Sequence, residues 1–484
     1  MQRFIFIKNL AILNYCLIMI FLYAAKVLGI NFPYGTGFAK TLVHGTKYYI
    51  KRGYKTMRRR VVITGMGAVT PLGSNLKTTW DNLMKAKSGI DHISLFDASS
   101  FPVKIAAEVK DFDESSIEVP EELENFTGRA TKFCLSATQE AIENACLDLD
   151  TIDPTMLGIS MGGNEETNKF SDLTDAYKVE NILDSMNRQD LSYFNNSNYL
   201  GQIWAVRRGA HTTSNILSIL YNAQGPVSTS STACASSTQA IGKAMRVIEH
   251  GDADIMITGG CDSIITEFSV AGFGLLGALS QNNDTPERAS RPFDLKRDGF
   301  VLGEGTGIFI MEELSHALKR GAKIHAEITG FGTSSNAYRI TDSPPDGRGP
   351  DHSMRSALQD AGLSPEDIDY INAHGTSTLV NDRSETQAIK KVFGEAAYGM
   401  PISSNKSMLG HLIASAGAIE LIVSVLTIRK SIIPPTINYE MPDPDCDLDY
   451  VPNEPRKHEV NAVLSNSFAF GGQNASLVVE GYQE

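Results

Sequence analysis

Short apolar runs alternate with longer segments of helical spacing along this chain. Residues 61–64 and 254–258 are apolar and β-branched runs of strand length, and glycines follow both. Residues 235–248 instead carry apolar side chains at positions 240, 241, 244, 245 and 248, the spacing of a helix with one buried face. Such alternation of strands with helices predicts an α/β fold.

The same order of elements occurs twice. Four segments of the first half are echoed in the second: 61–67 by 326–332, 157–163 by 370–375, the strand, turn and helix around residue 234 by 401–428, and 254–260 by 461–466. Each half therefore reads as three strand–helix units followed by a pair of strands. We predict two duplicated α/β halves, 57–316 and 317–484, which divide near residues 314–324.

One cysteine lies where a strand meets a helix. The segment Thr232-Ala-Cys-Ala-Ser-Ser-Thr238 follows an extended run and precedes the helix 235–248. Cys234 would then lie at the helix N-terminus, where free N–H groups and the helix dipole favour a thiolate. We interpret Cys234 as a nucleophile for an acyl group. The alternative is a small buried apolar residue, which is what most free cysteines are.

Two histidines also follow strands. His374 lies in Asn372-Ala-His-Gly-Thr, after the apolar run 368–371, and His411 precedes a helix of small residues at 412–428. Ligands of α/β proteins bind at the ends of strands. A lone histidine is more often a satisfied polar residue, but two in glycine-flanked turns at strand ends indicate catalysis.

Composition excludes several classes of protein. Six cysteines occur without paired spacing, so neither a disulfide framework nor a zinc site is indicated, and a reducing, cytoplasmic location is expected. The net charge of −13 argues against nucleic acid as a partner.

The first 56 residues differ from the rest. They contain no Asp or Glu, eight Lys or Arg, and an apolar run at 10–28. This segment has three interpretations: a membrane anchor, a transit peptide, or sequence upstream of the natural start. Met57-Arg-Arg-Arg, directly before the strand at residue 61, favours a start at Met57. Membrane contact is expected only if residues 4–28 are genuine.

Four motifs, in order, resemble the β-ketoacyl-[acyl-carrier-protein] synthases, and most closely the KAS I/II condensing enzymes of type II fatty acid synthesis. They surround Cys234, His374, Lys406 with His411, and Phe470 in Asn466-Ser-Phe-Ala-Phe-Gly-Gly. Segments 290–294 and 297–305 add to a similarity that runs from about residue 58 to the C-terminus. The resemblance implies the thiolase-like fold, a five-layer αβαβα sandwich with the site between the two halves.

The resemblance also implies the reaction. Malonyl-ACP would lose CO₂ and condense with an acyl chain bound to Cys234, giving a 3-oxoacyl-ACP two carbons longer by ping-pong kinetics, without a metal or another cofactor. His374 and His411 would stabilise the enolate. The N–H groups of Cys234 and Phe470 would form the oxyanion hole.

Supporting roles follow from the same resemblance. Lys406, paired with Glu420, would fix the histidine turn. Thr376 and Thr378 would bind the pantetheine arm, and Phe470 would gate the acyl pocket.

The implied partners are acyl- and malonyl-loaded acyl carrier protein and a second copy of the chain in a homodimer. Because the carrier is acidic, a local basic patch must exist on this acidic chain. Arg129 and Lys132 match the docking helix of the family, and Arg207 and Arg208 are further candidates.

Three rival functions remain open. The unusual region 168–217 suggests a specialised lipid or type II polyketide ketosynthase with the same chemistry. A non-catalytic partner subunit would be expected to lack the nucleophile, which is present here. Gly158-Ile-Ser-Met-Gly162 fits the elbow motif of a serine hydrolase, with Ser160 as nucleophile, but we expect Ser160 to line the acyl pocket instead.

Overall fold

The computed structural model describes residues 58–163 and 209–483, of which those from Arg59 onward belong to one compact unit. The leader 1–56, including residues 4–28, and Arg207 and Arg208 lie outside the described residues. Within the described ranges, no helix is long and apolar enough to cross a membrane. The predictions about the leader therefore stay predictions.

Ten strands of the described chain join edge to edge. They are β1 (Val61–Val69), β4 (Leu157–Gly162), β5 (Val227–Ser230), β6 (Ile255–Asp262), β7 (Gly305–Glu313), β8 (Ala326–Ser335), β9 (Tyr370–Asn372), β10 (Ile402–Ser403), β13 (Ala462–Phe468) and β14 (Gln473–Glu480). Two short antiparallel pairs of strands form separate sheets: β2 (Asp91–His92) with β3 (Ile105–Ala106), and β11 (Ile432–Ile433) with β12 (Arg456–Lys457).

The strand order shows the duplication. It runs β10-β9-β13-β14-β8-β1-β7-β6-β4-β5, so that each strand of the first half has a counterpart at the same distance from the middle. The strands at equivalent positions are those matched in the sequence: β1 corresponds to β8, β4 to β9, β5 to β10, and β6 to β13. β1 and β8 pair only over Val61–Ile63, which joins two five-stranded sheets at one end.

Helices cover and separate the two sheets. The main ones are α5 (Arg129–Ala145), α9 (Thr212–Leu220), α10 (Ser236–His250), α13 (Arg348–Ala361), α14 (Leu379–Phe393) and α16 (Ala416–Lys430). The shorter ones are α3 (Leu76–Leu83), α4 (Glu121–Glu124), α11 (Glu267–Leu275), α12 (Leu314–Lys319) and α15 (Lys406–Leu409). α5 packs on β1 and β7, whereas α13 packs on β8 and β14. α10 and α16 contact each other and strands of both halves.

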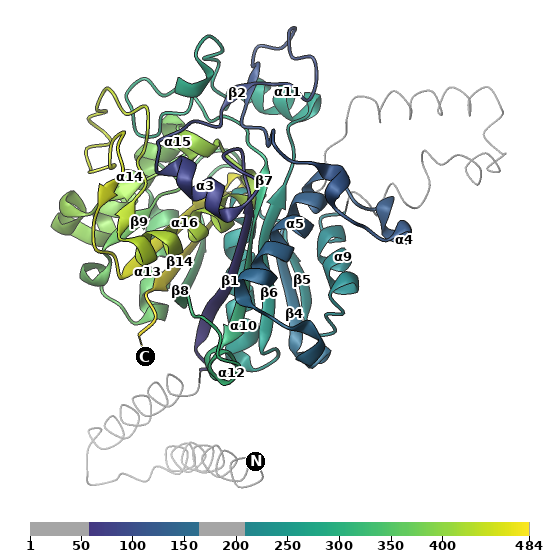
Figure 1. Cartoon of the computed structure of the whole chain (residues 1–484). Helices are drawn as coiled ribbons and strands as arrows, with labels where there is room; N and C mark the ends of the chain where they lie inside the picture. The colour runs from purple at the N-terminus through teal and green to yellow at the C-terminus, as the bar shows by residue number, and fades with distance from the viewer. Residues whose placement is uncertain (1–57, 164–208, 484) are drawn as a thin grey trace, which may run out of the picture. The chain divides into compact units, whose positions relative to one another are not determined.

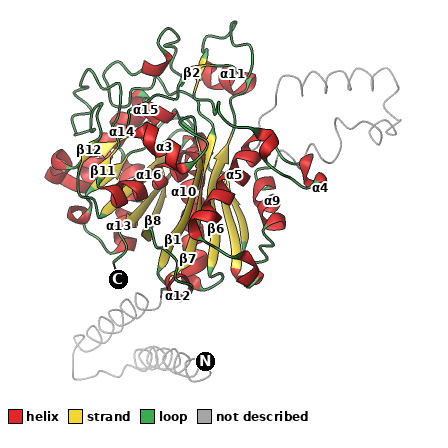
Figure 2. Cartoon of the chain, viewed as in Figure 1, coloured by secondary structure: helices red, strands yellow, loops and turns green. Residues whose placement is uncertain are grey.

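These contacts give five layers (Figures 1 and 2). From one side to the other they are α5 with α9, the first sheet, α10 with α16, the second sheet, and α13 with α14. This confirms the thiolase-like αβαβα sandwich that the resemblance implied. The boundary between the halves near residues 314–324 stays a prediction.

The central layer explains the composition of its helices. Residues 416–427 of α16 are all buried, because sheets lie on both of its faces. Gly417 allows α16 to approach α10 closely, since a Cβ there would lie 1.9 Å from Thr238 Oγ1. Both central helices begin at the same end of the sheets, and Cys234 lies just before α10 and His411 just before α16. His374 lies between β9 and α14.

Candidate active site

Cys234 lies at the predicted junction. β5 ends at Ser230, the short 3-10 turn Ala233–Ala235 holds the cysteine, and α10 begins at Ser236. Ala233 has a φ of 47°, a left-handed conformation that turns the chain sharply before the cysteine. The side chain of Cys234 is buried at the N-terminal end of α10.

The acidity of Cys234 differs from the expectation. Burial raises the pKa of the thiol to about 12, although Lys406 and backbone hydrogen bonds from Phe470 and Cys234 itself lower it. Desolvation of the charged form therefore opposes the effect expected from the helix N-terminus, and it favours the thiol in the free protein. The contributions of Phe470 and Cys234 place both N–H groups beside Sγ, where the predicted oxyanion hole would lie.

His411 contacts the sulfur directly. Its Nε2 lies 3.0 Å from Cys234 Sγ, and its Nδ1 accepts the backbone N–H of Ile413 at 3.2 Å. Burial, and then the charge of Lys406, lower the pKa of His411 well below its usual value, so the ring is neutral. A neutral ring whose Nδ1 accepts carries its proton on Nε2. His411 therefore presents an N–H to the sulfur.

His374 has the same tautomer for a different reason. Lys406 Nζ lies 3.3 Å from His374 Nδ1, and an ammonium can only donate. Burial, followed by the charges of Lys406 and His411, lowers the pKa of His374 well below its usual value. The two imidazoles meet edge to face with centroids 5.3 Å apart. Two neutral N–H donors therefore converge beside one cysteine.

Lys406 forms the predicted ion pair. Its Nζ contacts Glu420 Oε1, both side chains are 3% exposed, and Nζ also donates to the carbonyl of His374 at 2.6 Å. Burial raises the pKa of Glu420 to about 7, and Lys406 opposes the rise. Lys406 thus ties the His374 turn to α16.

Glu385 was missed by the sequence analysis. Its carboxylate, buried on α14, accepts the backbone N–H groups of His374 at 2.9 Å and Gly375 at 2.8 Å. Burial raises its pKa to about 7, and the two backbone hydrogen bonds oppose the rise. The available signal was an acid in the apolar stripe of a helix, in register with Ala388, Ile389 and Val392.

A pocket of about 290 Å³ leads to these residues. Cys234, His374, His411 and Phe470 line it, together with the predicted arm-binding residues Thr376 and Thr378. The two threonine hydroxyls lie 2.8 Å apart, so they can share donor and acceptor roles toward a ligand.

The phenylalanine predicted as a gate is half-buried and stacks on Phe273 at 6.3 Å between ring centroids. Gly471 and Gly472 follow it with φ of 85° and 78°, a conformation that glycine adopts without strain. The Phe470 turn can therefore pass close to the sulfur. The roles of Phe470 and the two threonines remain predictions.

The same three side chains could hold a metal ion. The ligand atoms of Cys234, His374 and His411 lie within 4.8 Å of one another. The expectation that the reaction needs neither metal nor cofactor is untested by this geometry.

Ser160 does not behave as a nucleophile. It lies on β4 with no exposed surface, and its Oγ donates to the carbonyl of Ala240 at 2.9 Å. Ser228 Oγ donates to it at 3.1 Å. Ser160 is not among the residues that line the pocket at Cys234. The expectation that it lines the acyl pocket stays a prediction.

The candidate docking residues are paired internally. Arg129 donates twice to Glu304, whose side chain is fully buried, and also contacts Glu114 and the carbonyl of Val109. Lys132 Nζ lies 3.3 Å from Glu124. These ion pairs reduce the positive charge that the two residues present to a partner. Docking at Arg129 and Lys132 therefore remains a prediction.

Comparisons with known proteins agree with this geometry. Residues 58–317 match the family model of the beta-ketoacyl synthase N-terminal domain, and residues 325–440 match that of the C-terminal domain. The chain is 44% identical over 422 residues to 3-oxoacyl-[acyl-carrier-protein] synthase 2 of Coxiella burnetii, covering 87% of this chain and 98% of that protein. It is 43% identical over 426 residues to the Synechocystis protein of the same name, covering 88% and 99%.

Solved structures agree as well. A beta-ketoacyl synthase from Burkholderia phymatum superposes with a TM-score of 0.79 at 34% identity, covering 88% of this chain and all of that one. A type II polyketide ketosynthase, solved in complex with its acyl-carrier protein, has a TM-score of 0.75 at 34% identity, with the same coverage. Fold, site geometry and similarity over most of the chain agree, and the chain belongs to the beta-ketoacyl synthase family.

Proposed function

We propose that this chain is an acyltransferase of the 3-oxoacyl-[acyl-carrier-protein] synthase 2 type. It takes an acyl chain from acyl carrier protein onto Cys234 and condenses it with malonyl-ACP, with loss of CO₂. The single observation that carries the proposal is the contact of His411 Nε2 with Cys234 Sγ, 3.0 Å apart, at the end of the pocket.

The first half-reaction transfers the acyl chain. Cys234 Sγ attacks the thioester carbonyl, a new C–S bond forms, and the bond to the carrier sulfur breaks. The cysteine proton leaves with the carrier thiol, so charge balances. The N–H groups of Cys234 and Phe470 stabilise the oxyanion of the tetrahedral intermediate. The raised pKa of the thiol means that its proton is lost only as attack begins.

The second half-reaction forms the carbon–carbon bond. The malonyl carboxylate leaves as CO₂, and the electron pair of the broken bond forms an enolate. The Nε2–H groups of His374 and His411 donate to the enolate oxygen. Burial and the charge of Lys406 lower the pKa of both rings, so each ring is neutral and keeps one N–H for this role. The enolate carbon then attacks the acyl carbonyl and expels the Cys234 thiolate, which takes a proton from solvent to restore the thiol for the next turnover.

The other candidate functions have less support. The relatives named 3-oxoacyl-[acyl-carrier-protein] synthase 2 are 42–44% identical to this chain, whereas the polyketide ketosynthase is 34% identical. A non-catalytic subunit would not need the complete Cys234, His374, Lys406 and His411 set.

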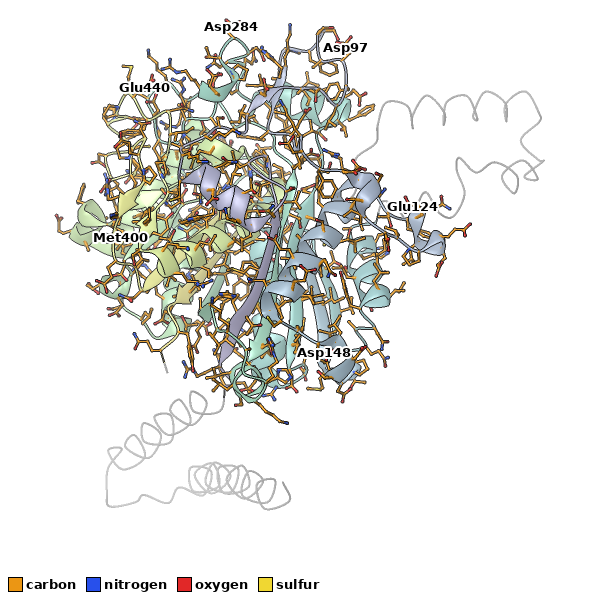
Figure 3. All side chains as sticks on the ribbon, in the orientation of Figure 1. Asp97, Glu124, Asp148, Asp284, Met400 and Glu440 are labelled. Carbon is orange, nitrogen blue, oxygen red and sulfur yellow. The ribbon has the colours of Figure 1, made fainter. Side chains whose placement is uncertain are left out.

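Acyl carrier protein is the proposed partner, and the active form is proposed to be a homodimer. Acidic side chains such as Glu124, Asp148, Asp284 and Glu440 lie at the edge of the described unit (Figure 3) and are exposed. An acidic carrier would be repelled where such side chains are not paired with a cation. The location of the dimer interface and of the basic patch is left to experiment.

Intact-mass analysis tests the proposal. The protein is exposed to acyl-ACP thioesters of increasing chain length, and then to malonyl-ACP. We expect a covalent acyl adduct that is absent in Cys234→Ala, and a 3-oxoacyl-ACP product two carbons longer after malonyl-ACP is added. A folded wild-type protein that forms no adduct with any carrier thioester would contradict the proposal and favour a non-catalytic subunit.

A further inference from the structure

Arg297 is a buried arginine to which the catalytic geometry assigns no role. It opens the family-like segment 297–305, which precedes β7, and its side chain has no exposed surface. A buried guanidinium is costly unless every donor finds an acceptor. Its contacts therefore show what the surrounding structure requires of it.

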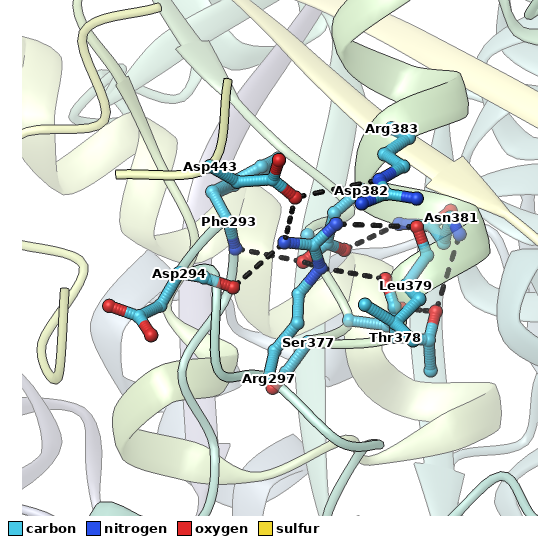
Figure 4. A network of polar contacts seen from close by, with 12 residues as sticks. Phe293, Asp294, Arg297, Ser377, Thr378, Leu379, Asn381, Asp382, Arg383 and Asp443 are labelled. Atoms are coloured by element: carbon cyan, nitrogen blue, oxygen red, sulfur yellow. Dashed lines mark hydrogen bonds and ion pairs between the residues drawn. The ribbon is translucent and has the colours of Figure 1, made fainter. Parts of the chain in front are cut away.

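Two of these contacts reach the turn after His374. Arg297 Nε donates to the carbonyl of Thr378 at 3.2 Å, and Nη2 donates to the carbonyl of Leu379 at 3.3 Å (Figure 4). Thr378 is the N-cap of α14, and Leu379 is its first residue. Both residues line the pocket that ends at Cys234.

The guanidinium is itself fixed from the other side. Nη1 donates to Asp443 Oδ2 and to the carbonyl of Asp294, both at 2.8 Å, and Nε lies 3.4 Å from Asp382 Oδ2. Asp382 Oδ2 also accepts the backbone N–H of Phe293 at 2.8 Å. These partners hold the planar fork in one orientation, which a lysine could not reproduce.

Arg297 also joins the two walls of the pocket. Asp298, Gly299 and Phe300 follow it directly and line the pocket, and the Gly299 N–H donates to the carbonyl of Ser377 at 3.1 Å. The Phe300 ring meets the His411 ring with centroids 5.4 Å apart. One side chain thus connects the wall that carries Phe300 with the wall that carries the threonines.

We propose that Arg297 is a positioning residue that holds the turn of Thr376 and Thr378 in the geometry that binds the thioester arm of the substrate. It touches no reacting atom and acts through the backbone of Thr378 and Leu379. This inference rests on the proposed function, because it assigns the arm of a pantetheine thioester to this wall of the pocket.

The test compares two arginine-to-lysine variants. Arg297→Lys keeps the charge and loses the fork. Arg320→Lys is the matched control: Arg320 also bonds a buried carboxylate, Glu312, and a backbone carbonyl, that of Ala145, but neither of these partners lines the pocket, whereas Thr378 and Leu379 do. For each variant one measures KM and kcat with acyl-ACP, the Kd of an unreactive pantetheine amide, and the rate of Cys234 alkylation by iodoacetamide.

We expect Arg297→Lys to raise KM and the Kd of the pantetheine amide about tenfold, with alkylation changed less than twofold. Arg320→Lys should leave KM, kcat, the Kd and the alkylation rate unchanged, even where it lowers Tm. Asp443→Asn, which weakens one contact of Arg297, should raise the same two constants about threefold, and it serves as the test if Arg297→Lys does not fold.

Unchanged Kd and KM in a folded Arg297→Lys or Asp443→Asn protein would overturn the positioning role alone. An equal rise in Arg320→Lys would overturn it too, because the effect would then be general. A wild-type protein that binds no pantetheine amide and forms no acyl adduct would overturn this inference together with the proposed function. If the acyl adduct forms normally and the Kd is unchanged in the variant, the positioning role fails while the proposed function stands.

Discussion

His411 Nε2 lies 3.0 Å from Cys234 Sγ, while its Nδ1 is occupied by the backbone N–H of Ile413. The first contact alone would fit a base that takes the thiol proton. The second fixes the neutral tautomer that donates from Nε2, which suits His411 to the proposed stabilisation of negative charge and not to accepting a proton.

Replacing His411 by alanine should separate the two half-reactions. We expect condensation to fall about 10²- to 10³-fold, because one N–H donor to the enolate is lost. The acyl adduct on Cys234 should still form and be visible by intact mass. His352→Ala, at an exposed histidine, serves as the control and should leave both steps unchanged. Loss of the adduct in His411→Ala would instead assign His411 to acyl transfer.

Alkylation of Cys234 should depend steeply on pH. Burial raises the pKa of the thiol to about 12, so the rate of reaction with iodoacetamide should rise about tenfold per pH unit between pH 7 and 10. Lys406→Met should slow the reaction at every pH, because the Lys406 charge lowers this pKa. A plateau below pH 8 would show a thiolate stabilised in the free protein, contrary to this expectation.

Glu385→Gln should flatten the pH dependence of stability. Burial raises the pKa of Glu385 to about 7, so the folded state binds the proton more tightly than the unfolded state. The stability that this contributes is present in acid and is lost as pH rises to 7 and beyond. Thermal unfolding between pH 5 and 8 should show a smaller fall in Tm for the variant. Glu420, with a pKa of about 7, should leave part of the slope. An identical slope in both proteins would contradict the assignment.

Substitutions of Arg129 and Lys132 should affect different properties, stability for Arg129 and carrier docking for Lys132. Arg129→Gln leaves the buried Glu304 without its main partner, so unfolding should become easier by about 3 kcal/mol, measured by denaturant titration. Lys132→Glu, at a pair with an exposed partner, should change stability little and raise KM for the carrier substrate several-fold. An unchanged KM would refute a docking role for Lys132.

Ser160→Ala should leave condensation within twofold of wild type. The hydroxyl donates to the carbonyl of Ala240, so its removal should lower the free energy of unfolding by about 1 kcal/mol and leave the rate of condensation unaffected. The rate of product formation from acyl-ACP and malonyl-ACP measures condensation, and denaturant titration measures stability. A loss of all activity would revive the serine hydrolase interpretation.

Local patterns were sufficient to predict much of the fold. The strand into residue 234 and the helix after it follow from apolar spacing, and the helix is observed at Ser236–His250. Matching segments of the two halves occupy matching positions in the sheet order, because a duplicated sequence buries its apolar residues in the same way twice. The family motifs named Cys234, His374 and His411, which the fold places around one pocket.

Other features could not be read from neighbouring residues. Glu385 bonds the backbone of His374 only because α14 folds back onto the turn, and Arg129 is neutralised by Glu304, which lies far away in the sequence. Ser160 fits a nucleophile motif, yet the sheet and α10 enclose it. In each case a partner from another element decides the role of the side chain.

The sequence by itself determined the class of elements and the duplication, and it supplied the candidate nucleophile and its two histidines, because apolar spacing and short motifs are local properties. Only the tertiary structure decided their chemistry. Burial raises the pKa of Cys234, which opposes the effect expected from the helix N-terminus, and Lys406 and Ile413 fix the histidine tautomers. Desolvation and long-range hydrogen bonds depend on which elements pack together, and packing is a property of the whole fold.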